Sequence, residues 1–109
     1  MARYGSILGI RPEAVAEYKR LHTGVWPEVL AQIRKSGIRN FSIFLREPEN
    51  LLFSYFEYEG DDFPADMAAM ATDPKTRQWW AICGPMQRRL ETTREGEWWG
   101  GMEEIFHLD

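Results

Sequence analysis

Two neighbouring segments, residues 38–46 and 51–59, constrain the fold most, because each carries large apolar side chains at both odd and even positions. Both segments are rich in Phe, Tyr, Ile and Leu, a composition typical of β-strands. The residues between them, Glu47-Pro48-Glu49-Asn50, are typical of a hairpin connection. The two segments therefore predict a pair of antiparallel strands.

Side chains in a strand alternate between the two faces of the sheet. An antiparallel sheet with one solvated face alternates apolar and polar residues in the same way. This pair does not alternate, so both faces of its sheet need a cover. The apolar residues divide into Phe41, Ile43 and Leu45 opposite Phe44, and Phe53 and Tyr55 opposite Phe56 and Tyr58.

The rest of the chain predicts one domain, residues 1–109, because this length is enough for one hydrophobic core and too short for two. The expected order is strand, two helices, two strands, two helices, strand, which is typical of a ferredoxin-like α+β unit with helices on one face of a four-stranded antiparallel sheet. We expect strands at 4–10, 38–46, 51–59 and 102–108, and helices at 12–21, 28–36, 63–71 and 75–83.

Helices in this order can cover only one face of the sheet. The second aromatic face is expected to pack against a copy of itself in a two-fold homodimer. The sequence does not decide whether the odd-numbered or the even-numbered positions of each strand face the partner. The residues we name for the interface are Phe44, Phe56 and Tyr58.

Charge and composition exclude several classes of partner. The net charge is −4 and there is no basic run, which argues against nucleic acid and anionic membrane surfaces. The only cysteine, Cys83, cannot form an internal disulfide and fits a reducing compartment. No apolar run approaches membrane-spanning length. We therefore expect a cytoplasmic domain.

The stretch from Glu17 to Leu30 holds the main chemical candidate. Tyr18 and His22 are four residues apart, so on a helix they project from the same face. Histidine as a residue type exchanges protons near neutral pH. An ordinary helix end with a cationic cap is the alternative interpretation of this pair.

Other chemical sites have weaker support. Two histidines and one cysteine give no recognisable metal-ligand spacing, so we expect no metal and no cofactor. Asp61, Asp62 and Asp66 fit capping and solvation better than an oxygen-ligand site. His107 and Cys83 are expected to be structural.

The adjacent pair Trp79-Trp80 is the second informative feature. Neighbouring helical residues point about 100° apart, so one tryptophan can pack inward while the other lines a cleft. Aromatic faces beside a few polar groups suit a small neutral ligand such as a sugar ring. Together with Tyr18 and His22, the pair suggests a polyol ligand and proton transfer.

These residues belong to a longer pattern that runs over nearly the whole chain. In order it comprises Tyr18-x-x-x-His22, Val25-Trp26-Pro27-Glu28, Asn50-Leu51-Leu52-Phe53, Trp79-Trp80 and Glu104-Ile105-Phe106-His107-Leu108. The combination resembles the L-rhamnose mutarotase family, although no single piece is specific.

The resemblance implies a dimeric α+β barrel of ferredoxin-like units and a cofactor-free isomerase that interconverts the α and β anomers of L-rhamnose. It implies that His22 is the catalytic acid/base and that Tyr18, Trp79 and Trp80 hold the sugar; Trp26 is a further candidate. Mutarotation opens and recloses a hemiacetal, which takes one proton to the ring oxygen and one from the anomeric hydroxyl. Neither transfer requires a metal or redox cofactor.

One residue departs from the family pattern. The family has a tyrosine among its sugar contacts on the second strand, where this chain has Phe41. We include Phe41 among the substrate-binding candidates, and the lost hydroxyl can relax or redirect the choice of sugar. The segment 60–67 and the Trp98-Trp99 insertion resemble a subgroup that acts on L-fucose, which is the sister hypothesis.

Two readings from other functional classes stay open on sequence grounds. The same order of elements serves cofactor-free monooxygenases and haem-degrading enzymes, and a non-catalytic sugar-binding module would carry the same aromatic residues. The proton that His22 moves is also undecided. Its partner group can be Tyr18 or a carboxylate.

Overall fold

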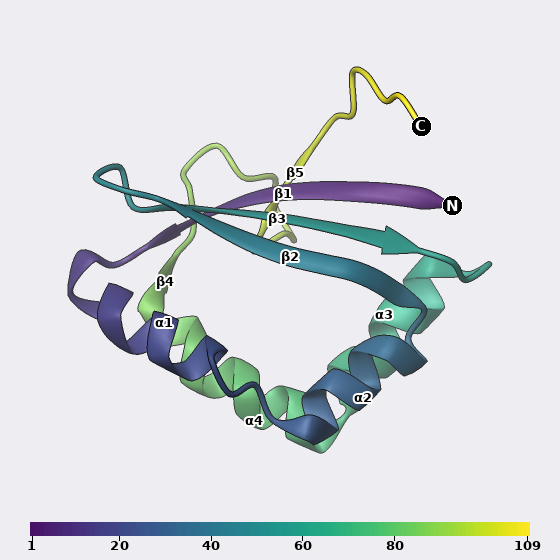
Figure 1. Cartoon of the computed structure of the whole chain (residues 1–109), viewed down its shortest axis with the longest axis horizontal. Helices are drawn as coiled ribbons and strands as arrows, with labels where there is room; N and C mark the ends of the chain where they lie inside the picture. The colour runs from purple at the N-terminus through teal and green to yellow at the C-terminus, as the bar shows by residue number, and fades with distance from the viewer.

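The computed structural model describes all residues of the chain, 1–109, as a curled sheet with four helices on one side (Figure 1). The ferredoxin-like α+β architecture is confirmed. No helix has both the length and the apolar character that crossing a membrane requires. The strands are β1 (Ala2–Ile10), β2 (Ile38–Arg46), β3 (Leu51–Tyr58), β4 (Gln87–Arg88) and β5 (Gly100–Met102), and the helices are α1 (Val15–His22), α2 (Pro27–Lys35), α3 (Phe63–Thr72) and α4 (Pro74–Cys83), with 3₁₀ turns η1 (Pro12–Ala14) and η2 (Gly84–Met86).

The sheet is antiparallel, with the strand order β2-β3-β1-β4 and with β5 also paired to β1. The hairpin β2–β3 forms one half, as the two apolar segments predict. β1 lies beside β3 along almost its whole length, from the pair Ala2–Tyr58 to the pair Gly9–Leu51. The hairpin is thus joined to the N-terminal strand in one continuous surface.

Local sequence explains where the helices begin and break. Proline occupies the first turn of α2, α3 and α4, where a missing backbone N–H costs nothing. Asp62 and Asp73 cap α3 and α4, accepting hydrogen bonds from the backbone N–H of Ala65 and Thr76. The break around Gly24 separates α1 from α2, so His22 lies at the C-terminal end of its helix.

Gly37 makes the turn from α2 into β2 possible. Its φ angle is +87°, a region that residues with a Cβ rarely adopt. A Cβ at this position would also lie 3.1 Å from the ring of Tyr58. The glycine therefore lets β2 start directly against β3.

The register decides which side chains face the helices. Ser6 pairs with Ser54 and Leu8 with Leu52, and these residues face the helical layer. In β2 a register shift between Arg39 and Ser42 changes the alternation. The predicted division is confirmed: Phe41, Ile43 and Leu45 lie on the helix side, and Phe44, 63% exposed, lies on the outer face.

The buried core occupies one end of the space between sheet and helices. It joins the C-terminal half of β1 to α1, α2, β3 and α4. At the other end, near the start of β2 and α3, Ile38 and Tyr58 are also buried but lie outside this cluster. The core consists of Leu8, Ile10, Tyr18, Val29, Leu52, Trp79 and Cys83.

The prediction of a fourth strand at 102–108 is wrong. Two short strands, β4 and β5, pair with different parts of β1 instead, and β5 ends at Met102, where the predicted strand was to begin. Residues 103–109 form no regular structure, and an ion pair between Arg3 and Glu104 (2.8 Å) ties their start to β1. Beyond it the tail rises above the outer face of the sheet (Figure 1). Its apolar side chains are exposed: Ile105 87%, Phe106 79% and Leu108 80%.

Two of the three residues named for the dimer interface are also wrong. Phe56 and Tyr58 face the helices, where the Tyr58 hydroxyl donates to Asp66 and its ring packs on Phe63. Only Phe44 lies on the outer face. Alternation along the strands could not show which residues face outward, because both faces of the sheet are apolar. The outer-face neighbours of Phe44 across the strands are Phe53 and Ile7.

Candidate active site

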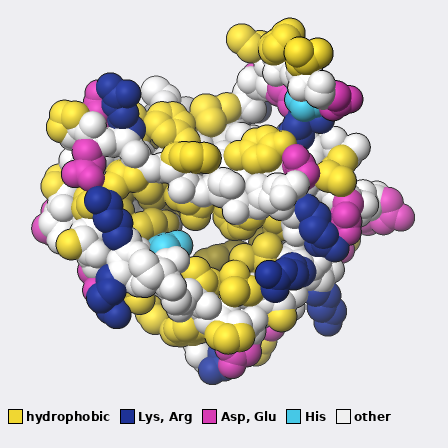
Figure 2. Space-filling model, in the orientation of Figure 1, with side chains coloured by type: hydrophobic (Ala, Val, Ile, Leu, Met, Phe, Trp, Pro, Cys, Tyr) yellow, Lys and Arg dark blue, Asp and Glu magenta, His cyan; other side chains and the backbone are white.

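A cavity of about 830 Å³ lies between the sheet and the helical layer and opens to the surface in Figure 2, where a histidine is visible on its wall. This volume is typical of a site for a small molecule. The lining is mainly apolar and aromatic, and it contains no carboxylate. The titratable side chains that line it are Tyr18, His22, Arg34, Arg39 and Cys83.

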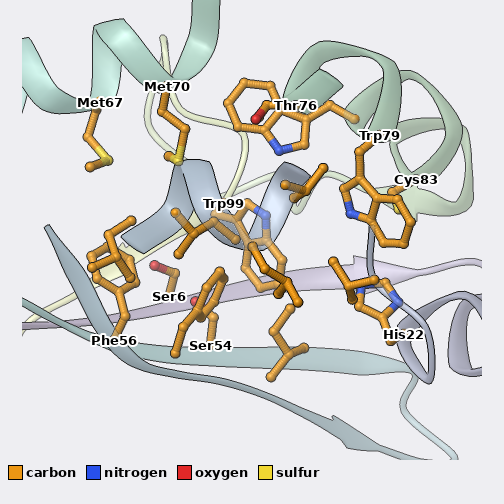
Figure 3. A pocket seen from close by; sticks show the side chains of 18 of the residues that line it. Ser6, His22, Ser54, Phe56, Met67, Met70, Thr76, Trp79, Cys83 and Trp99 are labelled. Carbon is orange, nitrogen blue, oxygen red and sulfur yellow. The ribbon is translucent and has the colours of Figure 1, made fainter. Parts of the chain in front are cut away.

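The cavity walls come from elements far apart in the sequence. Figure 3 shows Trp79 and Cys83 reaching down from α4 toward the sheet. Ser6 and Ser54 stand up from β1 and β3 on the opposite wall. His22 lies at one end of the cavity, below Trp79.

His22 is held between two aromatic rings. The Tyr18 ring stacks on the imidazole at 4.3 Å between centroids, and the edge of Trp79 approaches it at 5.5 Å. These contacts come from the predicted i, i+4 spacing on α1 and from the crossing of α4 above it. The imidazole is thereby fixed in one orientation.

The backbone of α1 determines the tautomer of His22. Its Nδ1 lies 2.7 Å from the carbonyl oxygen of Tyr18. A carbonyl oxygen can only accept, so Nδ1 carries a hydrogen. Nε2 has no protein partner and is therefore the nitrogen that remains for a ligand.

Tyr18 is buried, with 5% of its surface exposed, yet it also lines the cavity. Its hydroxyl oxygen accepts a hydrogen bond from Gln87 Nε2 at 3.1 Å. Burial raises the pKa of this phenol, and the bond from Gln87 lowers it to a smaller degree. The hydroxyl is accordingly neutral at pH 7.

Trp79 and Trp80 both line the cavity but differ in burial. Trp79 is 6% exposed and belongs to the core, while Trp80 is 45% exposed. This difference follows from their angular separation on α4. Trp26 does not line the cavity; its ring packs edge-on against Trp79 at 5.2 Å and supports it from behind.

Phe41 lies on the cavity wall formed by β2, 42% exposed, with its ring at 5.7 Å from that of Phe56. The neighbouring backbone is irregular, with Asn40 at φ = 51°. This irregularity turns the Phe41 side chain toward the helical layer. Position 41 therefore presents an apolar ring to the cavity, without the hydroxyl that a tyrosine would carry there.

Cys83 faces the cavity as a thiol rather than a thiolate. Burial raises its pKa to about 11, so at pH 7 the group is protonated. A protonated thiol is a weak nucleophile. The structural role expected for Cys83 is consistent with its place in the core.

The sequence did not single out several polar residues of the cavity. Ser6, Ser54 and Gln87 lie on strands whose local pattern gives no functional signal; only the strand register brings them together. Trp98 was noted only as part of an insertion, yet its indole Nε1 donates to Gln87 Oε1 at 2.7 Å. His107 lies away from the cavity, on the exposed tail, paired with Asp109 at 2.7 Å.

Comparison with known proteins adds an independent line of evidence. The sequence model of a family described as L-rhamnose mutarotase matches residues 3–108. The L-rhamnose mutarotase of Oceanobacillus iheyensis is 32% identical over 109 residues, with both chains fully covered. That of Mannheimia succiniciproducens is 37% identical over 110 residues, also with full coverage of both.

A solved structure supports the fold. The crystal structure of an L-rhamnose mutarotase from Formosa agariphila superposes with a TM-score of 0.80 at 21% sequence identity, covering 100% of both chains. At this identity the superposition speaks for the architecture alone. The match of the family model over almost the whole chain and the full-length relatives above 30% identity show that this chain belongs to the L-rhamnose mutarotase family.

Proposed function

We propose that this chain is a mutarotase that interconverts the α and β anomers of L-rhamnose, with His22 as the catalytic acid/base. Membership of the family supports the reaction and the sugar. The cavity supports the roles of individual residues. The single observation that carries the assignment to His22 is the bond from Nδ1 to the Tyr18 carbonyl, which leaves Nε2 as the free nitrogen on the cavity wall.

The chemistry needs two proton transfers. Opening the ring removes the proton from the anomeric hydroxyl, adds one to the ring oxygen and breaks the bond between the anomeric carbon and the ring oxygen. Closing the ring on the other face of the aldehyde reverses these steps and gives the other anomer. On opening, His22 accepts the anomeric proton at Nε2 while a partner group donates a proton to the ring oxygen; on closing, the imidazolium and the deprotonated partner exchange these protons back.

The partner of His22 in this scheme is the hydroxyl of Tyr18. No carboxylate lines the cavity, so the proton donor beside His22 has to be a neutral hydroxyl or thiol. The remaining cationic side chains in the lining, Arg34 and Arg39, can donate hydrogen bonds but do not release a proton at neutral pH. Tyr18 is also adjacent to the imidazole, with stacked rings.

We assign the binding of the sugar to the aromatic wall. The faces of Trp79 and Trp80 suit the C–H face of a pyranose ring, and Phe41 lies on the facing strand. Hydroxyl groups of the sugar have partners in Ser6 and Ser54 on the sheet. Trp26 contributes indirectly, through its contact with Trp79.

The test is magnetisation-exchange NMR on the anomeric protons of L-rhamnose, with and without protein. Wild-type protein is expected to accelerate exchange, and His22→Ala to lower that acceleration by about 10²–10⁴-fold, the usual contribution of a positioned acid/base. His107→Ala is the matched control, because His107 does not line the cavity. Its exchange rate should equal that of the wild type.

Two results would contradict the proposal. Sugar binding without faster exchange in the wild type would make the chain a binding module. Near-normal exchange in a folded His22→Ala protein would remove His22 from the mechanism. Running L-fucose in parallel decides the sister hypothesis, since a faster rate with L-fucose would reassign the natural sugar.

We also propose a homodimer formed by the outer face of the sheet. This face has no helix over it and carries Phe44, Phe53 and Ile7 in adjacent positions. The exposed apolar tail, with Phe106 at 79%, rises from the same side. Soluble monomers seldom leave such a continuous apolar surface in water. A second copy would cover the face and the tail at once.

Sedimentation velocity tests the dimer. A wild-type species of twice 12.8 kDa is expected at micromolar concentration. Phe44→Asp should shift it toward the monomer, because a carboxylate would be buried in the contact. Ile82→Asp is the control, since Ile82 is an exposed apolar residue on the helical side. A stable wild-type monomer at this concentration would contradict the proposal.

A cytoplasmic location, with no nucleic-acid or membrane partner, completes the proposal. It is supported by the single cysteine and by the net charge of −4. Fractionation of cells that express the full chain measures it directly. Recovery of the protein with the membrane fraction or with nucleic acid would contradict it.

A further inference from the structure

A chain of three side chains connects the surface loop before β5 to the cavity. The indole Nε1 of Trp98 donates to Gln87 Oε1 at 2.7 Å. The amide Nε2 of Gln87 donates to the Tyr18 hydroxyl at 3.1 Å. All three residues line the cavity, and Gln87 is 9% exposed. We refer to Trp98, Gln87 and Tyr18 as the relay.

The chemistry of the first member fixes the direction of the whole relay. An indole nitrogen can only donate, so the side of the Gln87 amide that faces Trp98 must be its oxygen. The amide NH₂ is then the side that faces Tyr18. The Tyr18 oxygen consequently accepts, and its own hydrogen has no acceptor among the protein atoms.

The scaffold holds Gln87 and Trp98 in place. Gln87 belongs to β4, where it pairs with Ile10 of β1. The loop that delivers Trp98 is tied down by Arg89, whose guanidinium donates to the carbonyl oxygens of Glu97 (2.8 Å), Thr93 (2.8 Å) and Arg94 (2.7 Å). The orientation of the Gln87 amide is therefore built into the fold.

We propose that Gln87 and Trp98 are positioning residues that hold Tyr18 as a hydrogen-bond donor toward an oxygen of the bound sugar. This inference rests on the proposed function, because it takes the ligand to be a sugar. The oxygen that Tyr18 contacts needs only a lone pair, so a ring oxygen or a hydroxyl oxygen satisfies it. Reversal of the relay would turn the Tyr18 hydrogen away from the sugar.

Gln87→Glu reverses the relay with almost no change in shape. The carboxylate still accepts from Trp98, but it also accepts from Tyr18, so the hydroxyl donates to the protein instead of the sugar. Sugar affinity and exchange rate should each fall by about tenfold, the loss expected for one ordinary hydrogen bond. Gln78→Glu makes the same charge change at an exposed position outside the cavity and should leave both unchanged.

The pH dependence distinguishes the relay from a purely structural role of Gln87. Once protonated, the carboxyl group that Gln87→Glu introduces would present a carbonyl oxygen to Trp98 and a hydroxyl donor to Tyr18, as the amide does. The ratio of variant to wild-type affinity should therefore recover toward one between pH 8 and pH 5. A ratio that stays constant with pH would overturn the inference.

A double-mutant cycle gives the second test. In a Tyr18→Phe background the relay has no terminus, so adding Gln87→Glu should cause little further loss of affinity. Trp98→Phe, which removes the indole N–H from the relay together with part of the ring, should behave in the same way and serves if Gln87→Glu fails to fold. Losses that add in full in the Tyr18→Phe background would mean that Gln87 and Trp98 act independently of Tyr18.

The readout keeps this inference separate from the proposed function. L-rhamnose affinity is measured by titration of tryptophan fluorescence, and anomer exchange by NMR on the same samples. A wild-type protein that binds L-rhamnose without accelerating exchange contradicts the mutarotase, while the affinity cycle still tests the relay. A wild-type protein that does not bind the sugar contradicts both.

Discussion

Trp79 and Trp80 are neighbours on one helix turn, and we predict that replacing each by alanine affects a different property of the protein. Trp79 is 6% exposed and packs on His22 and Trp26, whereas Trp80 is 45% exposed. Trp79→Ala should mainly lower the free energy of unfolding. Trp80→Ala should mainly weaken sugar binding.

The expected sizes follow from the buried areas. A buried aromatic side chain removes about 200 Å² from water, and at about 25 cal/mol/Å² this corresponds to about 5 kcal/mol as an upper value. For Trp79→Ala we expect a loss of about 3–5 kcal/mol, as for other large-to-small core substitutions. About half of the Trp80 side chain is exposed, so Trp80→Ala should cost about 2 kcal/mol by the same reckoning.

Two measurements on each variant decide the matter. Urea denaturation gives the free energy of unfolding, with an unchanged m-value as the check that both variants unfold from the same compact state. Titration with L-rhamnose, followed by the remaining tryptophans, gives the affinity. Trp98→Phe is unsuitable as a control here because Trp98 also lines the cavity. Equal stability losses with unchanged affinity at both positions would refute the division of roles.

Two further predictions concern single side chains of the cavity. Burial raises the pKa of Cys83 from 9.0 to about 11, so the thiolate is scarcer in the folded than in the unfolded chain. Iodoacetamide at pH 8 should therefore modify the native thiol far more slowly than the thiol in 8 M urea. Similar rates would contradict the burial of this side chain. The same shift stabilises the folded state below pH 9, and this contribution is lost as the pH rises toward 11. Phe41→Tyr adds a donor to the wall and should change the ratio of exchange rates for L-rhamnose and L-fucose by about tenfold; an unchanged ratio would show that position 41 does not contact the sugar.

The fold was predictable from sequence where a local signal existed. Hydrophobic runs and proline starts located three long strands and four helices to within a few residues. The fourth strand was placed wrongly at 102–108, because the apolar residues Ile105, Phe106 and Leu108 imitate a strand. Pairing is a tertiary property: β1 takes β4 and β5 as neighbours, and neither has a hydrophobic signal of its own.

The residues of the candidate site likewise divide into those that local sequence could identify and those that it could not. Tyr18 and His22 could be paired from helical spacing alone, and the Trp79-Trp80 pair from composition. Ser54 and Gln87 could not be found, since the register of the sheet, not the local sequence, brings them to the cavity. The residues of the outer face could not be identified for a related reason. Apolar residues occupy both odd and even positions of β2 and β3, so alternation does not show which of them face outward.

The electrostatic character of the cavity fits the reaction that the family catalyses. Mutarotation moves a proton from one oxygen to another and leaves the sugar neutral in both anomers, so the site does not have to hold a lasting charge. A buried carboxylate would need compensating partners, and no carboxylate lines the cavity. In the proposed mechanism, such a transfer uses one imidazole with its Nδ1 fixed by the helix backbone, one neutral phenol and an aromatic wall. We therefore expect the rate to depend on the tautomer of His22 and on the direction of the Tyr18 hydroxyl. Different parts of the chain determine them: α1 for the histidine, and β4 with the loop before β5 for the tyrosine.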